Sequence, residues 1–196
     1  MTETEKSQDS IYGATSSVLQ QLGNTLDSSS TKGILASLRN SVGRELNASS
    51  EVWPLLFESI NPDYLSKNGI PTAQETAMFA ALQLYGIGQQ GRSQSVFARG
   101  ADYRLGKALG TFRKSLDDSQ SFDRRFNQLV TSNSIQELLN HLRHLIKIAS
   151  GPSNSQWKMD YASLAEDLFY FQVANSNQVV FRWGQSYYWQ PAKQNK

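Results

Sequence analysis

The sequence predicts an all-α fold of about eight helices in two small helical lobes. Apolar residues recur three and four positions apart along most of the chain, which is the spacing of a helix with one buried face. Helix-capping residues precede several of these segments, and no series of segments alternates apolar and polar residues as strands do. The 196 residues, which include no cysteine, are enough to bury a hydrophobic core without disulfides or metal.

Residues 1–31 are predicted to form an extension with at most one loosely attached helix. The segment is rich in serine, threonine, glutamine and aspartate, and its apolar repeat is weak. Its last residues, 27–31, are expected to be a serine-rich tether to the rest of the chain.

Residues 32–90 are predicted to form an N-terminal helical lobe. Apolar residues at helical spacing predict two short helices, over 34–42 and 53–60. A longer helix is predicted to start after Thr72, because Thr72 and Glu75 have the spacing of a capping box and a regular apolar repeat follows them.

A basic, glycine-rich loop over 91–102 is predicted to separate the lobes. The preceding helix is expected to end at Gly86, where the residues GIGQQG match the G-x-G-x-x-G spacing of a dinucleotide-binding loop. That fingerprint needs a strand before it and a helix after it, whereas here a helix precedes and a loop follows. We therefore interpret these glycines as a helix end and a flexible loop.

Residues 103–196 are predicted to form a C-terminal helical bundle. The segments with helical spacing begin near Tyr103, Phe122, Ile135, Tyr161 and Val179. Ser134 with Glu137 is a second predicted capping box, and Asp160 is a predicted N-cap. Residues 179–183, VVFRW, have strand propensity when considered alone, but the absence of other strand signals favours a helix.

The sequence predicts no enzyme, metal or cofactor site, and no small-molecule substrate. His141 and His144 are three residues apart on one helix but have no third ligand for a metal. The adjacent acids at 117–118 and 166–167 point about 100° apart on a helix, so we interpret them as helix-end and surface charges. The serines lack the context of a nucleophile elbow, and neither histidine has a neighbour that marks a triad.

The distribution of charge favours an anionic partner for the middle of the chain. The net charge of the whole sequence is only +2. Residues 92–147, however, carry ten lysines and arginines against five acids, which is +5, and the remainder is −3. From charge alone, however, a solvated helical surface is the better explanation of this imbalance, so the function needs further evidence.

The chain is expected to be cytoplasmic, with no membrane partner. Its first residues lack the basic and apolar regions of a signal peptide. Its longest uncharged stretch, 76–91, is too short and too polar to cross a bilayer, and the lack of cysteine fits a reducing compartment.

Several cations are predicted to lie at the edge of an apolar helix face. On a helical wheel Arg143 borders the leucine stripe of its helix, with Lys147 further round. Arg125 borders the phenylalanine side of the preceding helix, whereas Arg124 faces away. Stems that lie on apolar surface hold their charged groups in place, which suits phosphate binding, but internal ion pairs explain the pattern equally well. The acids available for such pairs are Asp117, Asp118, Asp123 and Glu137.

Four segments carry a resemblance to a known family. They are YRLGKALGTF (103–112), DRRFNQLV (123–130), ELLNHLRHLI (137–146) and DYASLAEDLFYF (160–171). Their order and spacing resemble the CasB family, the small subunit of the Cascade complex in type I-E CRISPR systems. The resemblance covers about residues 34–189 and is strongest over 103–171, and the start and the aromatic tail of the chain have no clear family counterpart.

The resemblance implies an all-helical, two-lobed architectural subunit. In the family, two copies pack head to tail against the backbone subunits that coat the CRISPR RNA, within a complex that also holds a large subunit. The resemblance therefore implies that the chain supports the guide RNA–target DNA hybrid and the displaced DNA strand through sequence-independent phosphate contacts in basic grooves. The alternative is a helical protein-interaction adaptor with no direct nucleic-acid contact.

Ten basic residues are the candidate nucleic-acid contacts. By resemblance, Arg124 and Arg125 match the arginine pair of the family, and Arg143 matches the arginine of its leucine-rich helix. Lys107 matches the base after Leu-Gly, and Arg39 matches a basic position in the N-terminal lobe. The remaining candidates are Arg44, Arg92, Arg99 and Arg104 from the same resemblance, and Lys147 from the polar flank beside Arg143.

Overall fold

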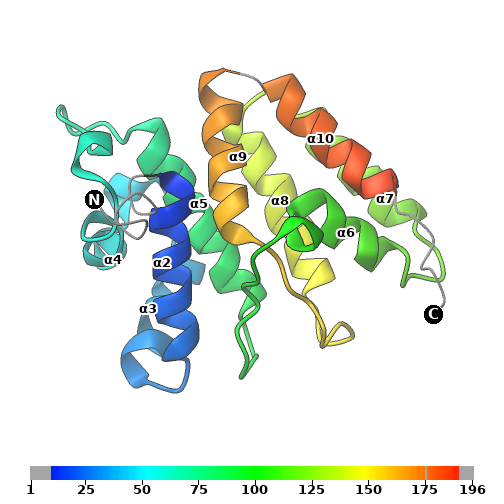
Figure 1. Ribbon diagram of the computed structural model, residues 1–196, viewed down its shortest axis with the longest axis horizontal. Coiled ribbons are helices and arrows are strands. Elements are labelled where there is room, and N and C mark those ends of the chain that lie inside the picture. Colours follow the sequence, from blue (N-terminus) through cyan, green and yellow to red (C-terminus); the bar gives the residue numbers. More distant parts are fainter. Residues whose placement is uncertain (1–9, 175, 190–196) are drawn as a thin grey trace.

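The computed structural model describes residues 10–174 and 176–189, and this part of the chain is all-α (Figure 1). It contains nine α-helices and four short 3-10 turns, which confirms the predicted fold class. The helices are α2 (Ile11–Asn24), α3 (Ser29–Asn40), α4 (Trp53–Phe57), α5 (Ala73–Gly88), α6 (Leu105–Arg113), α7 (Gln120–Val130), α8 (Ile135–Ala149), α9 (Tyr161–Val173) and α10 (Ser176–Tyr188). The turns are η1 (Leu46–Ala48), η2 (Ser50–Val52), η3 (Pro62–Tyr64) and η4 (Ala101–Tyr103). Residues 1–9 of the extension predicted over 1–31, and residues 175 and 190–196 of the bundle predicted over 103–196, lie outside the described residues.

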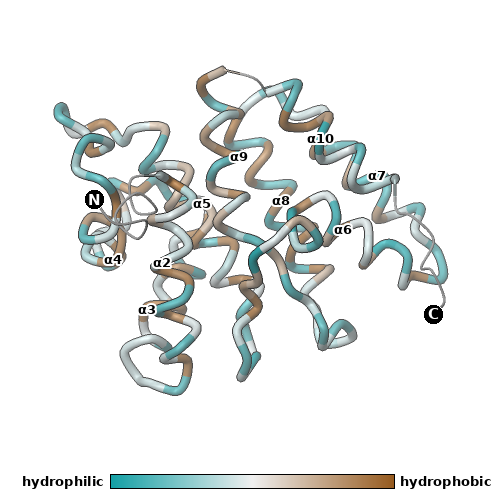
Figure 2. The backbone as a smooth tube through the Cα atoms, in the orientation of Figure 1, coloured by the Kyte–Doolittle hydropathy of each residue, from teal (hydrophilic) through white to brown (hydrophobic). Residues whose placement is uncertain are grey.

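The helices form two groups that share one hydrophobic core. Helices α2 to α5 lie at one end of the molecule and α6, α7 and α10 at the other, with α8 and α9 between them (Figure 1). Helix α5 packs along α9, and α2 packs against both of these helices. Apolar residues recur along α5, α8 and α9 in the middle of the molecule (Figure 2), and buried residues of both groups belong to one continuous cluster. None of the helices in the described ranges is long and apolar enough to span a membrane.

Helix α5 begins with the predicted capping box. The Thr72 side chain accepts the N–H of Glu75 at 3.1 Å, and Glu75 Oε2 accepts the N–H of Thr72 at 2.7 Å. The helix continues to Gly88, two residues beyond the predicted end at Gly86. Gly86 is a contact point and not a cap, because a Cβ at this position would lie 3.2 Å from the Cβ of Leu38 on α3. The glycine therefore lets α3 approach the central helix.

The N-terminal helix α2 is firmly packed, so the prediction of a loose helix is wrong. Its residues Val18, Leu19 and Leu22 are buried against α5 and α9. The predicted tether over 27–31 is also wrong, because Ser28 is the N-cap of α3 and its side chain accepts the N–H of Thr31 at 3.1 Å. The serines begin a helix here because their hydroxyl groups replace the missing hydrogen-bond partners of its first turn.

The predicted N-caps of α8 and α9 are confirmed, with one difference. Asp160 caps α9 by accepting the N–H of Ser163 at 2.9 Å. Ser134 caps α8 by accepting the N–H of Glu137 at 3.2 Å. The Glu137 carboxylate, however, accepts the N–H of Asn133 at 2.9 Å, so the reciprocal bond of a capping box is displaced by one residue. The VVFRW segment is helical, as predicted.

Candidate nucleic-acid interface

Helices α7 and α8 bury the apolar faces that the sequence predicts. Phe122, Phe126 and Leu129 of α7 are buried. In the leucine stripe of α8, Leu138, Leu142, Leu145 and Ile146 are buried, whereas Ile135 and Leu139 are half-buried. The two helices pack against each other, which fixes the positions of the cations along their edges.

Arg124, Arg125 and Arg143 are exposed on these helices. None of the ion pairs or hydrogen bonds found within residues 10–174 and 176–189 involves their guanidinium groups. Two of the four acids that could have paired with them have other partners. Asp123 binds Arg113, and Glu137 lies 3.9 Å from His141 and accepts a backbone N–H. The internal ion pairs that were one explanation for these arginines are thus not formed within the described residues.

A first hollow of about 700 Å³ lies between α5, α8 and the segment 42–46, and we call it the Arg143 hollow. It brings Arg143 and Arg44 to the same cavity, together with the polar side chain of Asn140. Its acids are Glu45 and Glu137. The apolar lining residues include Val42, Leu46, Ile70, Phe79, Leu84 and Leu139.

A second hollow of about 690 Å³ lies between η4, the start of α6 and α10, and we call it the Arg182 hollow. It brings together the candidates Arg104 and Lys107 and adds Arg182, which the sequence analysis did not select. Its acids are Asp102 and Asp167. The other lining residues are Ala101, Gly106, Trp183, Gln185, Ser186 and Trp189.

The remaining candidates lie outside both hollows. Lys147 is exposed one turn beyond Arg143 on α8. Arg39 on α3 is half-buried, and its stem lies beside α5 at Gly86. Arg99 is exposed, and its Nε donates to Ser16 Oγ at 2.8 Å.

Arg92 is occupied by internal hydrogen bonds. Its guanidinium donates to four main-chain oxygens of the loop before α9, at 2.7 to 3.3 Å. The segment that contains it is also fixed by Gln89, whose Nε2 donates to the carbonyl groups of Arg92 and Gln94 at 3.0 Å. The predicted flexible loop is therefore tied to the α8–α9 connection. The acceptors of Arg92 are the carbonyl groups of Ser150, Gly151, Asn154 and Ser155.

We expect Arg92→Ala to lower the free energy of unfolding by about 1.5 kcal/mol, the scale of a lost hydrogen bond from a charged donor. Its partners lie near the surface and can be satisfied by water, which limits the cost. Urea denaturation followed by circular dichroism measures the change. Lys158→Ala is the control, because Lys158 is exposed beside the same loop. Equal stabilities of the two variants would show that the Arg92 hydrogen bonds do not stabilise the fold.

A family model described as CRISPR-associated protein Cse2 matches residues 34–188, which is most of the chain. The chain belongs to the Cse2 family. This confirms the resemblance found in the four helical segments. No curated protein matches the sequence.

Solved structures of Cse2 and CasB proteins have the same fold. CasB from Thermobifida fusca is 22% identical with a TM-score of 0.71, over 90% of this chain and 97% of that chain. A CRISPR-associated protein of the Cse2 family from Thermus thermophilus is 20% identical with a TM-score of 0.62, over 96% of this chain and 99% of that chain. CasB from Thermus thermophilus is 19% identical with a TM-score of 0.60, over the same shares of the two chains.

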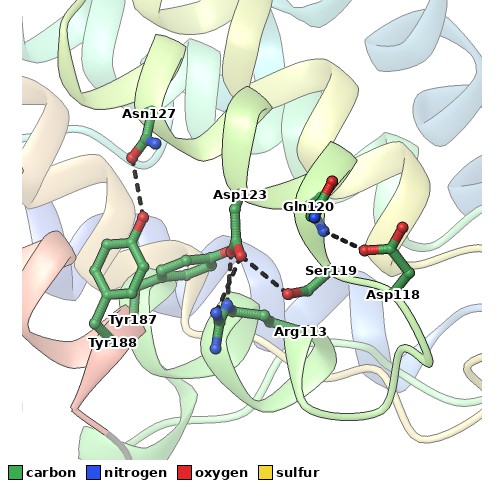
Figure 3. A network of polar contacts seen from close by, with 8 residues as sticks. All are labelled: Arg113, Asp118, Ser119, Gln120, Asp123, Asn127, Tyr187 and Tyr188. Atoms are coloured by element: carbon green, nitrogen blue, oxygen red, sulfur yellow. Dashed lines mark hydrogen bonds and ion pairs between the residues drawn. The ribbon is translucent and has the colours of Figure 1, made fainter.

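In this Cse2-family chain, a polar network connects α10 to α6 and α7 (Figure 3). Asp123 accepts from Arg113 Nε at 2.6 Å and Nη2 at 3.0 Å, and from the Tyr187 hydroxyl at 2.6 Å. The Arg113 hydrogen bonds hold the pKa of Asp123 below its ordinary value, whereas burial raises the pKa of Tyr187. Arg113 also lies 5.6 Å from the ring centre of Tyr188. This arginine is therefore structural, although it lies in the basic part of the sequence.

Asp167 corrects the interpretation of the acidic pair at 166–167 as surface charges. The side chain is buried, and it accepts from Arg182 Nη2 at 2.8 Å and Trp183 Nε1 at 2.7 Å. Burial raises the pKa of Asp167, against the lowering effect of these two neighbours. The carboxylate therefore holds Arg182 at the second hollow, a role that adjacent acids in a sequence do not reveal.

Each histidine of this Cse2-family chain lies close to a residue one turn before it on α8, and His141 Nε2 lies 3.9 Å from the Glu137 carboxylate. His144 Nδ1 lies 2.8 Å from the carbonyl oxygen of Asn140, one turn before it on α8. Within the described part of the chain, no group of three or more histidines and acids is placed to hold a metal ion.

Proposed function

We propose that the chain is a non-catalytic, architectural subunit of a type I-E CRISPR interference complex, Cascade, in the cytoplasm. It stabilises the guide RNA–target DNA hybrid and the displaced DNA strand through phosphate contacts that do not depend on sequence. Membership of the Cse2 family supports the assignment to a CRISPR complex. Its proposed partners are the subunits that coat the CRISPR RNA, the large subunit and a second copy of the chain.

The observation that carries the nucleic-acid part of this proposal is the unpaired state of three exposed arginines. Arg124, Arg125 and Arg143 make no ion pair within the described ranges, although acids follow or precede them in the sequence. Within the described residues, internal ion pairs therefore do not occupy these guanidinium groups. Guanidinium groups held at the edge of packed helices are instead available to phosphate oxygens, which they bind with two parallel hydrogen bonds.

Phosphate contacts are sufficient for this role. In RNA-guided recognition, base pairing between guide and target reads the sequence, and the protein holds the hybrid through its backbone. The Arg143 hollow places Arg44 and Arg143 on the wall of one cavity, and the Arg182 hollow adds Arg104 and Lys107. These two pairs are the proposed contact points, together with the arginine pair of α7.

Co-purification tests the assembly part of the proposal. The tagged chain is expected to capture the other subunits together with guide RNA. The RNA is identified as nucleic acid in the bound fraction that disappears when the fraction is treated with nuclease. Capture of the subunits without any RNA, or of no subunit at all, would contradict membership of a guide-loaded complex.

Single Arg125→Ala and Arg143→Ala variants are expected to weaken target DNA binding by the assembled complex. Each change should reduce the slope of log affinity against log salt by about 0.7 to 0.9, because one phosphate contact is lost. Filter binding at several salt concentrations measures the slope, and circular dichroism checks that helical content is unchanged.

Lys32→Ala is the matched control for these variants. Lys32 is exposed on α3 and lines neither hollow, so its removal should leave the slope unchanged. Normal affinity and slope in both arginine variants would favour the alternative of a protein-interaction adaptor without nucleic-acid contact.

A further inference from the structure

The Arg182 hollow contains an exposed aromatic ring beside its cations. Trp189 lines the hollow, and 74% of its surface is exposed. The main-chain N–H of Trp189 donates to the carbonyl oxygen of Gln185 at 2.8 Å, which continues the hydrogen-bond pattern of α10. The main chain of Trp189 is therefore held at the end of α10, and the described residues leave most of the indole uncovered.

Arg182 is held in this hollow by a buried carboxylate. Asp167 Oδ1 lies 2.8 Å from Arg182 Nη2, and Asp167 Oδ2 accepts the indole N–H of Trp183 at 2.7 Å. Burying a carboxylate costs free energy unless it is paired and hydrogen-bonded, and here both of its oxygens have partners. Half of the Arg182 side chain remains exposed, at 51%, and the residue lines the hollow. The guanidinium group is therefore tied to Asp167 and still accessible to a ligand.

Two more cations border the same cavity at the start of α6. Arg104 occupies the N-cap position, where no side chain caps the helix, and Lys107 lies in the first turn. Three cations thus line the hollow against two acids, and one of these acids is already bound to Arg182 and Trp183. The hollow is suited to an anion that also carries an aromatic face.

We propose that the Arg182 hollow binds one unstacked nucleotide of a single strand, with its base on Trp189 and its phosphates on Arg104, Lys107 and Arg182. This proposal rests on the proposed function and adds a contact to the base. The volume of about 690 Å³ lies in the usual range for small-molecule sites, about 300–1,000 Å³. A base inside a duplex is covered on both faces, so only a single strand can stack on the indole. Stacking on an aromatic side chain tolerates any base, so the contact stays independent of sequence.

The test compares two labelled oligonucleotides of about 12 residues, a length within the range of single-strand binding sites. One is oligo-dT, and the other is an abasic strand with the same phosphates. We expect Trp189→Ala in the full chain to weaken oligo-dT binding about tenfold by fluorescence anisotropy at low salt, and to leave abasic binding unchanged. Trp189→Phe should retain most of the affinity, because phenylalanine also stacks.

Phe181→Ala is the matched control. Phe181 is 65% exposed on the same helix but does not line the hollow, so its removal should change neither affinity. Unchanged oligo-dT binding by Trp189→Ala, or an equal loss on the abasic strand, would overturn the nucleotide site. Binding of neither strand by the wild-type chain would also overturn it.

The two proposals fail separately. If Trp189→Ala binds normally while Arg125→Ala and Arg143→Ala still lower the salt slope of the assembled complex, the nucleotide site is wrong and the proposed function stands. If all of these variants behave like the wild type in the assembled complex, the phosphate contacts are wrong as well.

Discussion

Replacing Asp123 with alanine is expected to lower the free energy of unfolding by about 3 kcal/mol, the lower end of the cost of breaking a buried ion pair. Asp123 receives the two bonds from Arg113, one from the Tyr187 hydroxyl and one from the Ser119 hydroxyl at 2.9 Å. The ion pair is mostly buried, with 29% of the Arg113 side chain and 22% of the Asp123 side chain exposed. Removal of the carboxylate leaves these donors without their acceptor, and α10 loses a connection to α7. Urea denaturation measures the loss.

The same contact should depend on pH. Because Arg113 lowers the pKa of Asp123 in the folded chain, the unfolded chain binds this proton more strongly, and acid favours unfolding. The contribution is complete above the ordinary aspartate pKa of about 3.9 and is lost as the pH falls through the lower folded pKa. The stability difference between the wild type and Asp123→Asn should therefore shrink below about pH 4.

Asp117→Ala is the control for the network. Asp117 is an exposed acid close in sequence to Asp123, so its removal should change stability by no more than about 0.5 kcal/mol. A similar loss in both variants, or a difference between the wild type and Asp123→Asn that does not change in acid, would show that the network contributes little.

Local signals in the sequence were sufficient for most helices. The capping pair of α5 and the apolar faces of α7 and α8 depend on residues three or four positions apart, so they can be recognised without the rest of the fold. Helix α2 shows where such signals fail. Thr15 and Ser16 are buried, because small polar side chains lie on faces of α2 that are covered by neighbouring helices. A helix that is covered on several sides has no clear apolar stripe to predict.

Contacts between residues that are far apart in the chain could not be predicted from the sequence patterns. Arg92 and Arg143 are both arginines in the basic part of the chain, yet one binds carbonyl groups about 60 positions away and the other is free of such contacts within the described residues. Arg182 was missed because its partner, Asp167, lies on the preceding helix. The pattern predicts where a cation lies on its own helix, and only the fold determines which acids and carbonyl groups reach it.

The packing of α10 against α6 explains the glycine of the Leu-Gly-Lys motif in α6. A Cβ on Gly106 would overlap the main-chain oxygen of Trp183 and lie 3.0 Å from its Cα. The glycine therefore allows the backbones of α6 and α10 to touch. The following residue, Lys107, lines the Arg182 hollow together with Trp189 and Arg182 of α10. Gly106 also lines this hollow, so the close contact lies beside the cavity proposed to bind a nucleotide.

Gly106→Ala is consequently expected to lower the free energy of unfolding by about 2 to 3 kcal/mol, the upper range for overpacking a close contact. The overlapping atoms belong to the backbone, so no side chain can rotate away, and α10 has to shift. In contrast, Gly33→Ala on α3 should be neutral or stabilising by up to about 1 kcal/mol, because nothing lies within 4 Å of its Cβ and alanine favours the helix. Thermal and urea denaturation compare the two. Equal stabilities would mean that α6 and α10 tolerate separation, and the motif would then need an explanation other than this contact.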